Sequence, residues 1–314
     1  ELEKPYELIS GDPQRPQKDH EVQPGWPFAP KNIDLRKGRR EAFSDWLTAK
    51  DNPLFARVAV NRLWQWHFGE GLQKLPSDFG HLGGMPSNPA LLEWLAAEFV
   101  ARGLDMKQMH KLMVTSATYK LASAADADLA AANAKIDPSN TFLWRYRIQR
   151  LEAEPIWDSI LTAAGDLDLT VGGPSFDLSG GGGRRTNVKR RAAYMVRGYS
   201  TNRDVTPNFL QTFDVDDGRA PCPMRTQTVT APQALFLMNS PEVNLAARQL
   251  AQRLRQSCGD DLSAAIDLGY RTTLARPPSP GEAREALTYL DGKPDRLNGL
   301  AWMLFNLDEF TYGR

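Results

Sequence analysis

The stretch NRLWQWHFGEGL, residues 61–72, closes a segment whose apolar side chains recur with the period of an α-helix. On a helical wheel of residues 54–68 the apolar side chains lie on two sides, one made by Phe55, Ala59, Leu63 and Trp66 and the other by Trp64 and Phe68. A helix that is apolar almost all round is usually central in its domain. The pattern therefore predicts a core helix in which Asn61, Arg62 and His67 are partly buried and bound to polar partners.

The aromatic side chains beside His67 also raise the alternative of a haem or ligand platform. Haem needs an axial ligand, and His67 is the one histidine of this stretch. The chain contains no Cys-x-x-Cys-His motif that would attach haem covalently. We therefore favour the core helix and expect no cofactor within this chain.

Helical periodicity also occurs on both sides of this stretch. It predicts helices near residues 37–49, 88–102, 105–120 and 152–165, and an all-helical C-terminal third. Helix-start signals support this pattern, namely Asn88 before a proline, and Thr230 and Ser279 each followed three positions later by Gln or Glu.

The middle of the chain, about residues 168–228, loses the helical period. Within it AAYMVRGYS, residues 192–200, alternates in the manner of a strand. The predicted fold class is thus mainly α, a multi-helical domain with a small β element and long irregular loops in this middle segment.

The domain organisation follows from the same patterns. Residues 1–33 carry six prolines among polar residues and no apolar period, which predicts an extended linker or arm with little regular structure. Residues 34–314 form the predicted helical domain, which could be subdivided into helical residues 34–167, a loop and strand insertion at 168–228, and helical residues 229–314.

Composition limits the classes of partner. Lys plus Arg equals Asp plus Glu at 38 each, so no overall field favours nucleic acid, and we expect none as a partner. No apolar run reaches the roughly 18 residues of a membrane-spanning helix, so we expect no membrane span. The charged, proline-rich start is unlike a signal peptide.

A basic, glycine-rich stretch, SGGGGRRTNVKRR at residues 179–191, is a candidate anion-binding loop. Glycine allows a close approach of backbone N–H groups, and arginine binds phosphate, sulfate or carboxylate with a two-pronged fork. The alternative is a solvated surface loop, because the stretch does not lead into a helix as phosphate-binding loops do. The candidate residues are Arg184, Arg185, Lys189, Arg190 and Arg191.

A candidate ligand site lies in the irregular middle segment, where function tends to lie. Tyr194, Arg197, Asp214 and Arg225 could together bracket a sugar or an anion. The competing interpretation is that Arg197 or Arg225 forms a buried ion pair with Asp214. A further alternative is that carboxylates of the middle segment serve as acid and base in glycoside hydrolysis, which needs two carboxyl groups at a fixed separation.

Other carboxylates have simpler interpretations. Asp214, Asp216 and Asp217 offer an alternative calcium site, although they lack the alternate spacing and the later Glu of the EF-hand pattern. Glu152 and Glu154 are two positions apart and do not share a helix face. We interpret them as charges that complement the helix dipole.

Six stretches carry a resemblance to a known family: NPLFARVAVNRLWQWHFGEGL, SDFGHLGGMPSNPALLEWLAAEFV, HKLMVTSATYKLAS, RLEAEPIWDSIL, CPMRTQTVTAPQALFLMNSP and LFNLDEFTYGR. In this order, from about Asn52 to Arg314, they resemble the C-terminal domain of a planctomycete-specific family of large exported proteins of unknown function. The resemblance implies that the chain is the C-terminal part of a longer exported protein, at the cell surface or in the periplasm. It also implies an N-terminal cytochrome c-like haem domain and a middle domain as partners, with c-type haem outside this chain and a link to polysaccharide breakdown. No catalytic residues are established for that family.

Export bears on the two cysteines, Cys222 and Cys258, because it would expose them to an oxidising environment. A disulfide between them is possible only if their α-carbons approach to about 7 Å, which the sequence leaves open.

Two functional classes remain. The first is a non-catalytic helical accessory or interaction module of a larger haem c-associated protein, which could hold a polysaccharide. The alternative is a hydrolase or other enzyme that acts on extracellular carbohydrate through the middle loops. The lack of a complete catalytic motif favours the module.

Overall fold

The computed structural model describes residues 5–22, 25, 36, 38–173, 189–195, 197–200, 203–204, 206–216, 218 and 220–313. The chain divides into two compact units, which are described separately. The first comprises Glu1–Leu121 and Ala132–Trp144, and the second comprises Ala122–Ala131 and Arg145–Arg314. The division passes through helix α5 (Ala127–Ile136).

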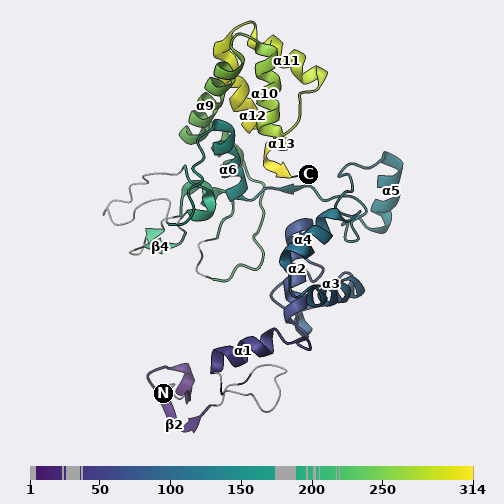
Figure 1. Ribbon diagram of the computed structural model, residues 1–314, viewed down its shortest axis with the longest axis vertical. Coiled ribbons are helices and arrows are strands. Elements are labelled where there is room, and N and C mark those ends of the chain that lie inside the picture. The colour runs from purple at the N-terminus through teal and green to yellow at the C-terminus, as the bar shows by residue number, and fades with distance from the viewer. Residues whose placement is uncertain are drawn as a thin grey trace. The chain divides into compact units, whose positions relative to one another are not determined.

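The N-terminal unit contains a group of three helices in which one packs against the other two. Its α-helices are α1 (Arg39–Leu47), α2 (Phe55–Phe68), α3 (Pro89–Ala101) and α4 (Met106–Thr115), and the short 3-10 helix η2 spans His81–Gly83. Helix α2 packs against both α3 and α4 (Figure 1). The predicted central helix at 54–68 is therefore confirmed in place and in extent.

The surroundings of α2 differ in part from the expectation. Asn61 is fully buried and His67 is half-buried, as predicted, but Arg62 is exposed and Trp66 is 62% exposed. The core face is instead made by Val60, Leu63 and Phe68 with side chains of α3 and α4. An all-round apolar composition thus overstated the burial, since in the described part of the N-terminal unit α2 packs mainly against α3 and α4 and leaves Arg62 and Trp66 exposed.

Regular structure also occurs in the predicted linker. Strand β1 (Tyr6–Leu8), 3-10 helix η1 (Ile9–Gly11) and strand β2 (Pro16–Glu21) form an antiparallel hairpin. Little regular structure was expected in this arm, and these residues nevertheless form a hairpin. Pro16 begins β2, a position where a strand tolerates the missing N–H group.

The C-terminal unit is a larger helical assembly with two small strand pairs. Its α-helices are α6 (Ala153–Ala164), α7 (Asn208–Thr212), α8 (Ala231–Asn239), α9 (Pro241–Cys258), α10 (Leu262–Leu274), α11 (Pro280–Leu290), α12 (Leu297–Phe305) and α13 (Asp308–Thr311). Its 3-10 helices are η3 (Ala192–Tyr194) and η4 (Pro294–Arg296). Strand β3 (Gln149–Arg150) pairs antiparallel with β6 (Tyr312–Gly313), and β4 (Tyr199–Ser200) pairs with β5 (Arg203–Asp204).

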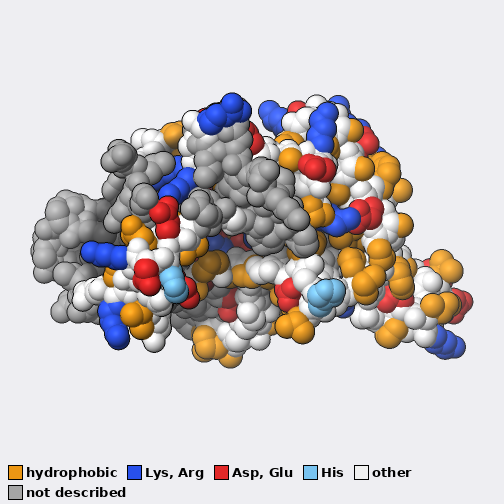
Figure 2. All heavy atoms as spheres, turned by 90° about the horizontal axis from the view of Figure 1, so that it is seen from below, with side chains coloured by type: hydrophobic (Ala, Val, Ile, Leu, Met, Phe, Trp, Pro, Cys, Tyr) orange, Lys and Arg blue, Asp and Glu red, His pale blue; other side chains and the backbone are white. Residues whose placement is uncertain are grey.

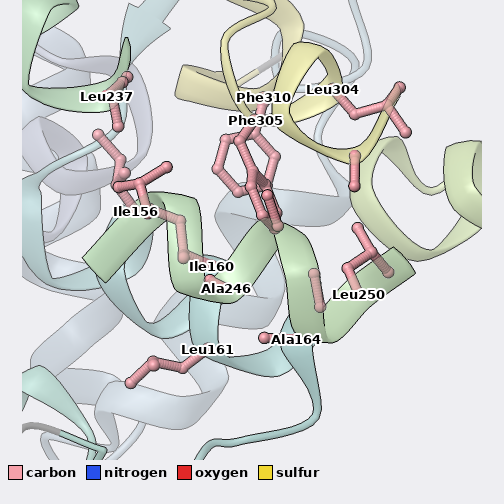
Figure 3. Packing of buried hydrophobic residues seen from close by; sticks show 14 of the residues in the cluster. Ile156, Ile160, Leu161, Ala164, Leu237, Ala246, Leu250, Leu304, Phe305 and Phe310 are labelled. Atoms are coloured by element: carbon pink, nitrogen blue, oxygen red, sulfur yellow. The ribbon is translucent and has the colours of Figure 1, made fainter. Parts of the chain in front are cut away.

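The core of this unit forms around α9, which packs against α6, α10 and α12. Figure 3 shows side chains of α6, such as Ile160, facing those of α9 and α12, such as Leu250 and Phe305. These three side chains are at most 2% exposed. Burial of each of these side chains contributes about 1.5–3 kcal/mol to the free energy of folding. The same core cluster includes side chains of α6 and α8, and the starts of these two helices carry polar groups of the clusters below.

The helix-start signals behave as predicted. The side chain of Asn88 accepts a hydrogen bond from Leu91 N at 3.1 Å. Gln233 accepts one from Thr230 N at 3.1 Å, and Glu282 accepts one from Ser279 N at 2.7 Å. Glu282 also binds Arg276 at 2.8 Å, and this hydrogen bond, with that from Ser279, lowers the pKa of Glu282 to about 2.

The middle segment matches the expectation only in part. A small β element is present there, as β4 and β5, but of the predicted strand at 192–200 Ala192–Tyr194 form a 3-10 turn and only Tyr199–Ser200 are strand among the described residues. Helix α7 was not predicted, because five residues are too few for a period to be recognised. The predicted fold class, mainly α with a small β element, is confirmed. No described helix is both long and apolar enough to cross a membrane.

Candidate functional site

The charged residues of the middle segment separate into distinct clusters within the C-terminal unit. Asp214 belongs to one cluster and Arg225 to another, so neither form of the predicted Asp214 pair, with Arg197 or with Arg225, occurs among the described residues. Asp214 instead binds Arg150, which lies 64 positions away in the sequence. Arg225 binds Glu154, which lies 71 positions away.

Asp214 lies at the end of α7 and binds Arg150 of strand β3. Its Oδ2 accepts hydrogen bonds from Arg150 Nη2 at 2.6 Å, from Thr228 N at 2.9 Å and from Gln233 Nε2 at 3.2 Å. Its Oδ1 accepts a bond from Thr228 Oγ1 at 2.7 Å. Four donors thus converge on one carboxylate and join β3, α7 and the start of α8.

The backbone and the charge of Asp214 are both set by this position. Its φ of 66° lies in the left-handed region, which Asp and Asn adopt more readily than most residues. Burial alone would raise the pKa of the carboxyl, but the hydrogen bonds from Thr228 and Gln233 and the charge of Arg150 outweigh it and lower the pKa. Asp214 is therefore a permanent anion at neutral pH.

Arg225 holds the two glutamates at the start of α6. Its guanidinium donates to both oxygens of Glu154, at 2.7 and 2.9 Å, and to Glu152 at 2.8 Å. The hydrogen bond to Glu154 is the largest cause that raises the pKa of Arg225. Glu152 is the residue before the helix and has an extended backbone, so it can reach the same partner as Glu154. The expected role at the helix dipole did not include this ion pair.

Arg197 pairs with Asp216 at 3.3 Å, and Asp216 also lies 3.9 Å from Arg225. Asp214 and Asp216 therefore face different cations. Asp217, the third member of the alternative calcium site, lies outside the described residues.

The described part of the basic stretch is also engaged within the unit. Lys189 binds Asp166 at 2.7 Å and Arg191 binds Asp158 at 3.0 Å. Arg190 is buried and donates to the carbonyl oxygens of Thr170 at 2.6 Å and of Gly172 and Gly173. These contacts anchor the end of the stretch to the turn at 168–173.

Three further candidate residues complete the comparison with the sequence. Tyr194 lies under the guanidinium of Arg190, whose central carbon is 4.8 Å from the ring centre, and so belongs to the anchor of the basic stretch. Arg184 and Arg185 lie outside the described residues.

On the face drawn in Figure 2, acidic and basic side chains of the described residues are interspersed.

The two cysteines are free thiols in the structure. Cys222 is exposed, and its Sγ lies 3.5 Å from the carbonyl oxygen of Met224. Cys258 is half-buried at the end of α9.

A cavity of about 740 Å³ opens in the same unit, lined by residues of α6, α7, α8 and α9. Its apolar wall includes Trp157, Phe209 and Phe236, and the ring centres are 4.8 Å apart for Trp157 and Phe209 and 5.3 Å apart for Phe209 and Phe236. This volume lies within the usual range for small-molecule sites.

The exposed part of the cavity lining is both polar and apolar, and Leu235 is 54% exposed there. Asn208, Asn239 and Glu242 line it and are exposed. Sequence reasoning missed this site, because its residues come from four helices. The signal that could have drawn attention to it is the run from Pro232 to Glu242, where two helices meet at an Asn-Ser-Pro junction.

A second polar constellation lies in the N-terminal unit. Asn61 of α2 donates to Gln73 O at 3.0 Å and accepts from Gln73 N at 2.8 Å. Gln73 in turn donates to the carbonyl oxygens of Asp78 and Gly83, at 2.9 and 2.8 Å. A Cβ at Gly71 would lie 2.6 Å from Asn61 Nδ2, so glycine is required there. These bonds fix the loop between α2 and α3.

His67 lies next to His110 of α4, with Nε2 of the first 2.8 Å from Nδ1 of the second. Burial, and then the charge of His110, lower the pKa of His67. The predicted polar network on α2 thus consists of two parts, the His67–His110 pair and the two hydrogen bonds between Asn61 and the backbone of Gln73.

The comparisons with known proteins give a family but no function. No curated protein matches the chain, and no solved structure matches it. A family model described as "Protein of unknown function (DUF1553)", PSD1, matches residues 39–290, which is more than half of the chain. The chain therefore belongs to this family of proteins of unknown function.

Proposed function

We propose that the chain is a non-catalytic helical accessory module of a larger exported protein that carries c-type haem in another domain. Its partners are then the haem-bearing and middle domains of that protein, and its wider role is in polysaccharide breakdown. Membership of a family of unknown function is compatible with this role. The resemblance of the ordered motifs from Asn52 to Arg314 supports the export and the haem-bearing partner.

The observation that carries the non-catalytic assignment is the pairing of the middle carboxylates. Asp214 accepts four hydrogen bonds within the unit, and Glu154 is held by both arms of Arg225. A carboxylate whose oxygens are bound by side chains of the same unit stabilises the fold.

A glycoside hydrolase would need a different environment for its two carboxyl groups. One must keep a raised pKa to act as an acid near neutral pH, and both must face the sugar bond. Asp214 has a lowered pKa and points at Arg150 and Thr228. This geometry favours an ion-pair frame over an acid and base pair.

The experiment compares binding with turnover for the same protein. The purified chain is incubated with uncharged and sulfated polysaccharides, and both retention on the polymer and new reducing ends are measured. We expect retention on at least one polymer without reducing ends above a heat-inactivated control. Reducing ends that increase with protein concentration above the heat-inactivated control would establish the hydrolase instead.

The haem assignment has its own test. The purified chain should lack a Soret band, whereas the chain co-expressed with the upstream domains of its own gene should co-purify with covalent haem. A Soret band at one haem per chain in the isolated protein would contradict the proposal, as would an upstream sequence without Cys-x-x-Cys-His.

A further inference from the structure

We infer that the contact between helices α2 and α4 is a pH-sensitive switch, which opens when the facing side chains of His67 and His110 both carry a positive charge. Histidine changes its charge close to neutral pH, so a pair of histidines at a helix contact responds to mild acid. The inference goes beyond the proposed function and does not depend on it. It is carried by the geometry of the two rings and by the core residues beside them.

The two imidazole rings are arranged to share a single proton. His67 Nε2 lies 2.8 Å from His110 Nδ1, which is the distance of a hydrogen bond. The ring centres are 5.1 Å apart, close to that distance plus the radii of the two rings, so both nitrogens lie near the line that joins the centres. Each nitrogen therefore points at the other, and one hydrogen atom fits between them.

The charge that this arrangement tolerates follows from the number of hydrogens on the facing nitrogens. In the neutral pair one nitrogen donates its hydrogen and the other accepts it. With one positive charge the pair keeps this bond, because a charged imidazole still donates to a neutral one. With two charges both facing nitrogens carry a hydrogen, neither can accept, and two like charges lie side by side. The doubly charged pair must separate.

The charged groups of the packed helices do not offset this repulsion. Helices α2 and α4 contain no acidic residue, and their other charged side chains are Arg57, Arg62, Lys107 and Lys111. The two acidic side chains of α3 are already paired, Glu93 with Arg57 and Glu98 with Arg102. From the segment after α4 the ring of Tyr119 faces His67, with the ring centres 5.7 Å apart. The lowered pKa of His67, caused by burial and then by the charge of His110, agrees with this surrounding.

Separation of the two rings would open the core of the N-terminal unit. Met109 and Met113 of α4 are at most 2% exposed, and they belong to one cluster with Phe68 of α2. His67 directly precedes Phe68, and His110 directly follows Met109. Movement of the rings away from each other therefore draws these apolar side chains apart and exposes them to water. Acid is then expected to release α4 in a local step, before the whole unit unfolds.

A metal ion shared by the two histidines is the competing interpretation. Zinc lies about 2.0–2.1 Å from each histidine nitrogen and takes four ligands in a tetrahedron. Two bonds of this length do not fit in a straight line within the 2.8 Å between His67 Nε2 and His110 Nδ1. Among the described residues, no group of three or more His, Cys, Asp and Glu side chains is placed to hold a metal ion. The geometry thus favours a shared proton.

The test uses the purified full chain, with 15N-labelled histidine, between about pH 7.5 and about pH 5. At the higher pH, NMR should detect a coupling between His67 Nε2 and His110 Nδ1 through the hydrogen bond, and this coupling should vanish in acid. Amide hydrogen exchange is measured as protection relative to the intrinsic rate at each pH. We expect the protection of α4 to fall by at least about tenfold over this range, and that of α3 by less than about threefold.

Histidine variants identify the groups responsible. His110→Gln removes one of the two charges while its amide can still bond to His67, so the protection of α4 should change by less than about threefold with pH. His67→Gln should behave in the same way, and it replaces His110→Gln if that variant lacks protection of α4 already at about pH 7.5. The matched control is His81→Gln, an exposed histidine of η2 in the same unit, which should respond to acid as the unaltered chain does.

Four results would overturn the inference. They are the absence of the nitrogen–nitrogen coupling at about pH 7.5, an equal loss of protection in α3 and α4, and acid sensitivity of α4 that persists in the glutamine variants. The fourth is a melting temperature that about 0.1 mM zinc chloride raises above its value in EDTA, and that both glutamine variants leave at the EDTA value. This last result would establish a metal site in place of the switch.

Discussion

Replacement of Asp214 by asparagine should lower the free energy of unfolding of the C-terminal unit by about 3 kcal/mol. The change removes the charge while keeping the size of the side chain, and asparagine also adopts the left-handed φ of 66° readily. The substitution leaves the guanidinium of Arg150, whose side chain is 6% exposed, without the negative charge of Asp214. Breaking a buried pair costs about 3–5 kcal/mol, and the lower end applies because the Asp214 side chain is 18% exposed.

Thermal and urea unfolding followed by circular dichroism will measure the effect. For a unit of this size, about 3 kcal/mol corresponds to a fall in Tm of about 6–12 °C. The matched control is Asp216→Asn, whose partner Arg197 is 39% exposed, so that the loss should stay below about 1 kcal/mol.

A second variant tests the cause. Arg150→Met combined with Asp214→Asn removes the stranded charge, so the double variant should be more stable than the sum of the single losses predicts, by at least about 2 kcal/mol. A loss below about 1 kcal/mol for Asp214→Asn alone would refute the reasoning, since the pair would then behave as a solvated surface ion pair.

Three further changes test other parts of the structure. The pKa of Glu282 is depressed from 4.5 to about 2, so its contribution is complete above pH 4.5 and is lost as the pH falls towards 2, and in urea titrations Glu282→Gln should lack this loss. Gly71→Ala should destabilise the N-terminal unit by about 1–3 kcal/mol, because its Cβ would lie 2.6 Å from the Asn61 amide, whereas Gly281→Ala in an open helical position should not, and equal melting temperatures would contradict this. The lowered pKa of His67 means that the unfolded chain binds the proton more tightly, so the stability of the unit should decline as the pH falls below 6.5, and His67→Gln should decline less over this range in urea unfolding.

The sequence by itself determined most of the longer helices and where several of them begin, although it missed the ten-residue helix α5. Apolar spacing predicted the helix at 54–68, and the capping patterns at Thr230 and Ser279 marked the starts of α8 and α11. These features depend on residues within about one or two helical turns, so their physical causes are contained in a short stretch of chain. Short elements such as α7 offered too few residues for a period.

Only the tertiary structure decided the partners. The sequence identified Asp214 and Arg225 as candidates but suggested that they form an ion pair with each other. In the structure Asp214 pairs with Arg150 of β3, and Arg225 pairs with Glu154 of α6. The cavity that gathers Trp157 with Asn239 was likewise invisible, because its walls come from segments far apart in the chain. The reason is physical: a charge or an aromatic ring has many compatible partners in the sequence, and the buried core, formed by long-range packing, selects the one that lies within contact distance.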